Sequence, residues 1–241
     1  MWTWKQLDEN SAYILPHRNF SGKEEIKEEL PENLEPIDFA KLYLTDEIID
    51  LIVVETNRYA QQYIADHMPL PPHSPVNDWK PTTPDEIRCF LGFCILMGII
   101  YKPHLNMYWS SDDLYQTRIF GETMTPDRCL LLLRFLHFAN NNDLNPKDPD
   151  RDHLGKIRPL INLVRAHCSV VYSPGKDLCG DESLLLFKGR LAFKQFIHTK
   201  RARFGIKLYQ LYTSHGILLD FLVYYGRMSQ ELVQVQNLTM S

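Results

Sequence analysis

The sequence predicts an α+β protein in which a helical region, about residues 40–172, precedes an antiparallel sheet that begins near residue 177. Two observations predict this order. Helix start signals and long apolar runs fill the first part of the chain, whereas short apolar runs separated by glycines follow the turn at residues 173–175. With 241 residues, 44% of them apolar, the chain is long enough to bury a sizeable core.

The first forty residues are expected to form an acidic, extended arm. Residues 23–29 read KEEIKEE, and prolines stand at positions 16, 31 and 36. Such a composition has too little apolar surface to pack into a core. A plain linker is the alternative reading, and the sequence leaves it open.

Three local signals predict where helices begin. Thr45 can cap a helix whose first turn carries two acids and which runs to about residue 65. Residues 83–86, Thr-Pro-Asp-Glu, form a capping-box pattern, and Thr125 followed by Pro126 repeats the same start signal. A fourth helix is expected over about residues 156–172 from its apolar spacing.

The period of the apolar residues changes after residue 175. Apolar runs at residues 178–187, 204–213 and 217–225 are followed by Gly189, Gly216 and Gly226. Runs of this length between glycines are typical of strands. We therefore predict three strands in an antiparallel meander.

The composition argues for an intracellular protein without a membrane span. The longest apolar stretch, residues 90–101, is interrupted by two glycines and is shorter than the roughly 20 residues that cross a bilayer. The N-terminus lacks the pattern of a secretory signal. The five cysteines never form a C-x-x-C pair, which argues against a zinc knuckle or a disulfide framework.

The charge distribution points to a basic surface near the end of the chain. The net charge is −4, yet residues 177–241 carry eight Lys or Arg and only five Asp or Glu. Between residues 188 and 207 there is no acid, and three phenylalanines are interleaved with seven cations. The candidate DNA-binding residues are Lys188, Arg190, Lys194, Lys200, Arg201, Arg203 and Lys207. A solvated hairpin edge bearing lysines explains the same pattern equally well.

Asp181 is the candidate metal ligand and catalytic residue. It opens an apolar strand directly before the basic segment, where a carboxylate could hold Mg²⁺ near a phosphate. One carboxylate does not make a metal site, because such sites need ligands that converge from several elements. A strand-end aspartate without a catalytic role is the alternative.

Several segments together resemble the piggyBac transposase family and its domesticated, element-derived relatives. The similarity covers about residues 20–227, and no single motif carries it. The segments are residues 39–47 (FAKLYLTDE), 55–60 (ETNRYA), 154–160 (LGKIRPL), 172–175 (YSPG), 181–190 (DESLLLFKGR) and 200–207 (KRARFGIK).

The resemblance implies a domain organisation and a site. Residues 1–40 would be the arm, 41–176 a helical dimerisation and DNA-binding region, 177–227 the first strands of an RNase H-like catalytic domain, and 228–241 a divergent tail. The family uses three aspartates and Mg²⁺ or Mn²⁺, and Asp181 matches the first of the three. The implied partners are DNA and a second subunit, either another copy or a full-length relative, and the implied location is the nucleus.

The chain also departs from the family pattern. After Asp181 the only acids are Glu182, Asp220 and Glu231, and none stands in the family's second aspartate motif. We therefore expect a truncated transposase, related to cut-and-paste transposition but catalytically incomplete. A domesticated DNA-binding or protein-interaction module that modulates a full-length relative is the main alternative, and a nuclease with unrecognised ligands is a third.

Overall fold

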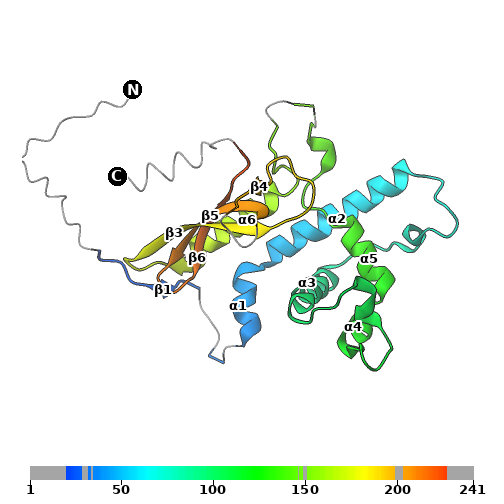
Figure 1. Cartoon of the computed structure of the whole chain (residues 1–241), viewed down its shortest axis with the longest axis horizontal. Helices are drawn as coiled ribbons and strands as arrows, with labels where there is room; N and C mark the ends of the chain where they lie inside the picture. The colour runs from blue at the N-terminus through cyan, green and yellow to red at the C-terminus, as the bar shows by residue number, and fades with distance from the viewer. Residues whose placement is uncertain are drawn as a thin grey trace, which may run out of the picture.

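The computed structural model describes residues 20–28, 32–33, 35–145, 147–148, 151–198 and 203–226, and all structural statements below refer to these residues. Figure 1 shows a helical region on one side and a sheet on the other, which is the α+β order that the sequence predicts. The α-helices are α1 (Pro36–Tyr43), α2 (Asp46–Asp66), α3 (Pro84–Ile99), α4 (Arg118–Thr123), α5 (Pro126–Phe135) and α6 (Arg158–Val171). Short 3₁₀ turns lie at Pro75–Asp78, Leu105–Trp109 and Asn141–Asp143. None of the helices in these ranges is long and apolar enough to cross a membrane.

The predicted starts of α3 and α5 are confirmed. The hydroxyl oxygens of Thr83 and Thr125 each accept a hydrogen bond from the backbone N–H three residues later, as an N-cap residue does. Helix α2 also begins directly after Thr45, but that hydroxyl makes no cap bond. It lies 3.1 Å from Nε2 of His167 on α6, so Thr45 joins two helices that are distant in sequence.

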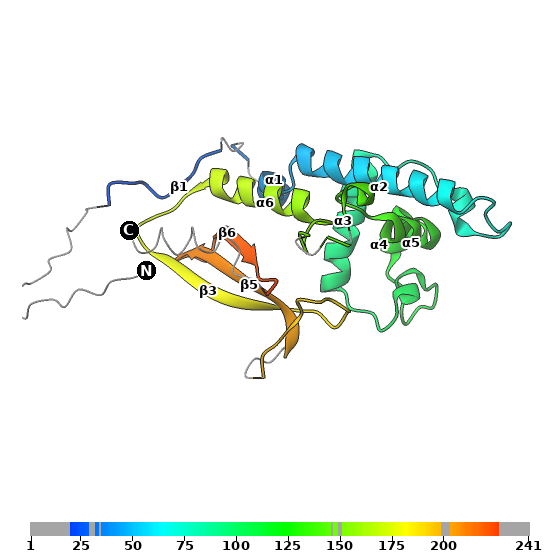
Figure 2. The same ribbon diagram turned by 90° about the horizontal axis from the view of Figure 1, so that it is seen from above.

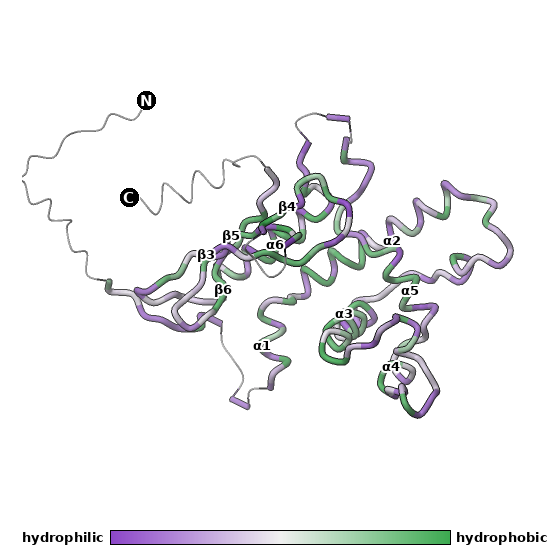
Figure 3. Tube along the Cα trace, in the orientation of Figure 1, coloured by the Kyte–Doolittle hydropathy of each residue, from purple (hydrophilic) through white to green (hydrophobic). Residues whose placement is uncertain are grey.

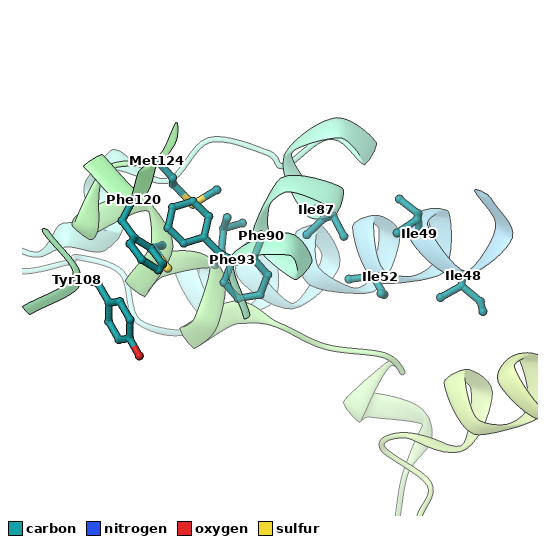
Figure 4. Packing of buried hydrophobic residues seen from close by; sticks show 11 residues of the cluster. Ile48, Ile49, Ile52, Ile87, Phe90, Phe93, Tyr108, Phe120 and Met124 are labelled. Atoms are coloured by element: carbon teal, nitrogen blue, oxygen red, sulfur yellow. The ribbon is translucent and has the colours of Figure 1, made fainter. Parts of the chain in front are cut away.

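The main core lies where α2, α3 and the segment before α5 meet. Figure 4 shows Ile49 and Ile52 of α2 near Ile87 and Phe90 of α3, and Ile48 of α2 belongs to the same cluster. The other buried members of this cluster are Phe93, Tyr108, Phe120, Met124, Cys129 and Leu132. A second cluster surrounds Phe135 at the end of α5. Burial of these side chains, rather than intrinsic helix propensity, holds the short helices in place.

The sheet has the predicted antiparallel meander, with β5 at its centre. Strands β3 (Leu178–Leu186) and β6 (Leu218–Val223) pair with opposite edges of β5 (Phe204–Thr213). The two-residue strand β4 (Gln195–Phe196), which the sequence did not predict, pairs with the start of β5. Among the described strands, β3 pairs only with β5, so its other edge carries no partner there.

Helix α6 lies along one face of the sheet, as Figure 2 shows. Ile161 of α6 packs with Leu154 and with Phe193 from the connection between β3 and β4. The polar loop that precedes α6 lies beside this contact and contrasts with the apolar helix α3 in Figure 3. This apolar cluster joins the helical region to the sheet, and Phe193 brings part of the basic segment into it.

Part of the expected N-terminal arm packs against the fold. Strand β1 (Glu25–Ile26) pairs with β2 (Tyr172–Ser173), and the Tyr172 hydroxyl donates a 2.8 Å hydrogen bond to Glu24. Helix α1 also begins inside the segment for which the composition predicts an extended chain. Residues 1–19 of the arm lie outside the described ranges.

Candidate nucleic-acid interface

Asp181 lies in the middle of β3 with its side chain exposed to solvent. Its Oδ1 accepts a 2.7 Å hydrogen bond from the backbone N–H of Glu182, and no described residue hydrogen-bonds its second carboxylate oxygen. Because side chains alternate along a strand, Asp181 and Leu185 share one face of the sheet and Glu182 points to the other. The two adjacent acids of β3 therefore lie on opposite faces of the sheet.

Glu182 is held by Lys207 on the face opposite to Asp181. The Lys207 ammonium lies 2.8 Å from the Glu182 carboxylate and 4.6 and 5.6 Å from the ring centroids of Tyr209 and Tyr224. Partial burial lowers the pKa of Lys207, but its hydrogen bonds to Glu182 and Tyr209 outweigh that effect and leave the pKa above its ordinary value. Lys207, one of the predicted DNA-binding residues, thus has partners within the sheet.

The described residues do not fit a complete metal site. No group of three or more His, Cys, Asp or Glu side chains is close enough to hold an ion anywhere in the described ranges. Asp220, the next acid along the chain, accepts two hydrogen bonds from Arg165 of α6, at 2.7 and 3.1 Å. Mg²⁺ prefers several oxygen ligands at once. A magnesium site at Asp181 with protein ligands therefore requires further carboxylates from outside the described ranges.

Three predicted DNA-binding residues are exposed cations. Lys188, Arg190 and Arg203 form no side-chain hydrogen bond or ion pair with any residue that the structure describes. Lys194 differs, because its ammonium donates a 2.9 Å hydrogen bond to the carbonyl oxygen of Gly189 and lies 5.6 Å from the ring of Phe204. The two remaining candidates, Lys200 and Arg201, lie outside the described residues.

Arg190 lines a groove of about 450 Å³ together with Lys156, which precedes α6. The turn that presents Lys156 is held by two hydrogen bonds from Arg158 to Asp152, at 2.7 and 2.8 Å, and by the buried side chain of Leu154. Asp143, Asp148 and Asp152 also line the groove, so it is not uniformly basic. The charge pattern of the sequence does not single out Lys156, although it stands inside the segment 154–160 that carries part of the family resemblance.

Comparison with known proteins identifies the family. A family model for DDE transposases, described as transposase IS4, matches residues 35–241. The chain belongs to this transposase family. The α+β class and the resemblance to piggyBac-derived proteins that the sequence predicts are confirmed.

The human relatives are PiggyBac transposable element-derived proteins. Protein 2 is 31% identical over 192 residues, which cover 79% of this chain and 29% of that protein. Protein 3 is 31% identical over 192 residues, which cover 80% of this chain and 30% of that protein. The chain therefore spans less than a third of the length of these curated transposase relatives.

A solved structure has the same fold. It is the cryo-EM structure of a piggyBac transposase synaptic complex with hairpin DNA, with a TM-score of 0.73 and 25% sequence identity. The match covers 91% of this chain and 46% of that transposase chain. Almost all of the architecture described above is thus shared with a transposase that was solved bound to DNA.

Proposed function

We propose that this piggyBac transposase-derived chain binds DNA through the exposed cations beside β3 and that residues 1–241 do not cut DNA on their own. The single observation that carries the proposal is the placement of Lys188, Arg190 and Arg203 on the connections between strands, next to the strand of Asp181. The human relatives and the DNA-bound neighbour support the same assignment. The resemblance to the piggyBac family favours a nuclear location.

Exposed cations without partners favour a phosphate backbone as the ligand. A cation that is already paired must give up that pair to bind a phosphate, whereas an unpaired cation releases only water and counterions. Lys207 and Lys194 have protein partners, so we assign the larger share of the binding free energy to Lys188, Arg190 and Arg203. Lys156 extends the same surface onto the helical region through the groove that it shares with Arg190.

Neutralising Lys188, Arg190 and Arg203 together as glutamines is expected to weaken DNA binding and to reduce its salt dependence. The slope of log affinity against log salt should fall by about 1 for each cation that binds a phosphate in the unaltered chain. Fluorescence anisotropy on a duplex at several salt concentrations measures both quantities. A matched variant with Lys27, Lys80 and Arg118 changed to glutamine removes three exposed cations elsewhere and should leave the slope unchanged. Equal slopes for all three proteins would refute the assignment.

The chain is expected to show no metal-dependent cleavage of DNA. Glu182 is bound to Lys207 and Asp220 to Arg165, so neither acid joins Asp181 in a metal site. The measurement incubates DNA bearing piggyBac terminal repeats with Mg²⁺ or Mn²⁺ and compares this chain with its Asp181→Ala variant, with an active piggyBac transposase as positive control. Cleavage by the unaltered chain that the substitution abolishes would mean that other residues complete the site.

The second candidate function is a protein-interaction module that modulates a full-length relative. Helix α3 supports it, because Ile95 and Ile99 leave an apolar strip of that helix exposed, Ile99 by 76%. Such a strip fits a second subunit. If the chain stayed monomeric in analytical ultracentrifugation up to high concentration, self-association through α3 would be ruled out.

A further inference from the structure

Two aromatic rings are exposed side by side in the basic segment. Phe196 of β4 and Phe204 of β5 are direct cross-strand partners, and their ring centroids lie 4.7 Å apart with 41° between the ring planes. Phe196 is 57% exposed and Phe204 48% exposed, and neither belongs to the buried clusters of the described residues. Large aromatic side chains in a small protein domain are more often covered than this.

Hairpin stability accounts for the contact between the two rings but not for their exposure. Cross-strand aromatic pairs stabilise two-stranded ribbons modestly. Phe193, three residues before Phe196, is only 8% exposed because it packs against Leu154 and Ile161. The same segment therefore buries one phenylalanine against the helical region and leaves the next two facing solvent.

The charges around the pair favour one kind of ligand. Lys194 lies over the Phe204 ring and Arg203 precedes it, and no acid occurs in the sequence between Glu182 and Asp220. A protein partner would need an acidic and apolar surface to match this mixture. An unpaired nucleotide supplies both features in one unit, since its base offers a flat face for stacking and its phosphate pairs with the cations. The bases of an intact duplex are already stacked on each other.

The pair lies on the same face of the sheet as Asp181. The register pairs Leu185 with Ile206 and Phe196 with Phe204, so strand alternation places Asp181, Leu185 and Phe204 on one face. At about 3.3 Å per residue, the rings lie roughly 20 Å from Asp181 along the strands. Phe204 is the first residue of β5, and Figure 2 shows this start of the strand curving away from the helices.

We infer that Phe196 and Phe204 form a stacking platform for unpaired nucleotides. The inference rests on the proposed DNA binding and makes it more specific, because the cations would hold any DNA backbone while the rings select DNA with exposed bases. Single strands, frayed ends and hairpin loops are the substrates of this class.

The test changes both rings to leucine, which keeps apolar volume but removes the aromatic faces. Fluorescence anisotropy compares a single-stranded oligothymidine with a blunt duplex of equal length at several salt concentrations. We expect the Phe196→Leu/Phe204→Leu variant to lose roughly 5- to 100-fold in affinity for the single strand, as stacking contributions predict. Affinity for the duplex and both salt slopes should stay unchanged. A Phe39→Leu variant, which alters a partly exposed ring on α1, is the matched control.

A second variant keeps the inference testable if the leucine variant folds poorly. Phe196→Tyr/Phe204→Tyr preserves two aromatic faces and should bind the single strand as the unaltered chain does, with an unchanged circular dichroism spectrum. Equal losses on single strand and duplex, or no loss on either, would overturn the platform and leave the cation-based proposal intact. If the leucine variant lost self-association but still bound DNA, the two rings would form a contact between protein chains, and the stacking platform would be overturned as well. If the unaltered chain bound no DNA, the proposed function itself would fail.

Discussion

Replacing Phe90 by alanine is expected to lower the free energy of unfolding by about 3–5 kcal/mol, the usual range for removing a large buried aromatic side chain. Phe90 is 1% exposed and lies on α3 at the centre of the main core, facing the isoleucines of α2. The alanine would leave a cavity between α2 and α3, which are held together mainly by the packing of their side chains. Urea denaturation followed by circular dichroism measures the change.

Two control variants separate the cavity from effects on helix propensity. Phe90→Leu keeps much of the volume and should cost clearly less than the alanine variant. Ile99→Ala removes an exposed side chain from the same helix and should change stability by no more than about 0.5 kcal/mol. If Phe90→Ala were as mild as Ile99→Ala, the core would not depend on the contact between α2 and α3.

Replacing Arg128 by methionine is expected to cost about 2–4 kcal/mol. Arg128 donates hydrogen bonds of 2.7 and 2.6 Å to the Glu86 carboxylate, and its guanidinium lies 4.6 Å from the ring centroid of Trp79. Without it, the Thr82 hydroxyl is the one remaining hydrogen-bond donor to the Glu86 side chain among the described residues. This expected loss of stability is somewhat smaller than the loss for breaking a fully buried ion pair, because the Glu86 side chain remains 26% exposed.

Because of the same ion pair, the free energy of unfolding should depend on pH. Burial raises the pKa of Glu86, but the hydrogen bonds from Arg128 and Thr82 outweigh burial and bring the pKa below its ordinary value. A carboxyl with a lowered folded pKa stabilises the fold fully above its unfolded pKa, about 4.3. This stabilisation is lost as the pH falls from there through the folded pKa.

Urea midpoints at pH 7, 5 and 3 test this expectation. The Arg128→Met variant should lose less stability between pH 5 and 3 than the unaltered chain, since its Glu86 no longer has the stronger partner. Other carboxylates, such as Asp152, titrate equally in both proteins and cancel in the comparison. A Glu86→Leu/Arg128→Met double variant should recover part of the loss. Parallel pH profiles would show that Glu86 is not held by Arg128.

Local signals in the sequence sufficed for the elements whose ends they mark. The Thr-Pro pairs before α3 and α5 predict their first residues because the cap bond and the proline act within one turn. Strands β3, β5 and β6 were predicted from apolar runs that are separated by glycines. Strand β4 and the pairing of β1 with β2 could not be predicted, since two-residue strands have no period and exist only because a distant partner lies beside them.

The site was predicted less completely than the fold. The basic composition of residues 188–207 identifies a charged segment but cannot distinguish free cations from paired ones. Lys207 joins Glu182 because the register of β3 on β5 brings them together, and register is a tertiary property. Lys156 joins Arg190 through the contact of Leu154 with Phe193, which no local pattern encodes.

Among the strands that the structure describes, β3 has one edge without a partner, which gives Asp181 a second physical role. An exposed strand edge can pair with the same edge of another molecule, and charged side chains are a common protection against such assembly. Asp181 is exposed on that strand and its negative charge discourages sheet extension, whereas the charge of Glu182 is compensated by Lys207. Removing Asp181 as a catalytic control therefore also removes a barrier to aggregation. Light scattering at the assay concentration should accompany any measurement on Asp181→Ala, so that precipitated protein is not mistaken for an absence of chemistry.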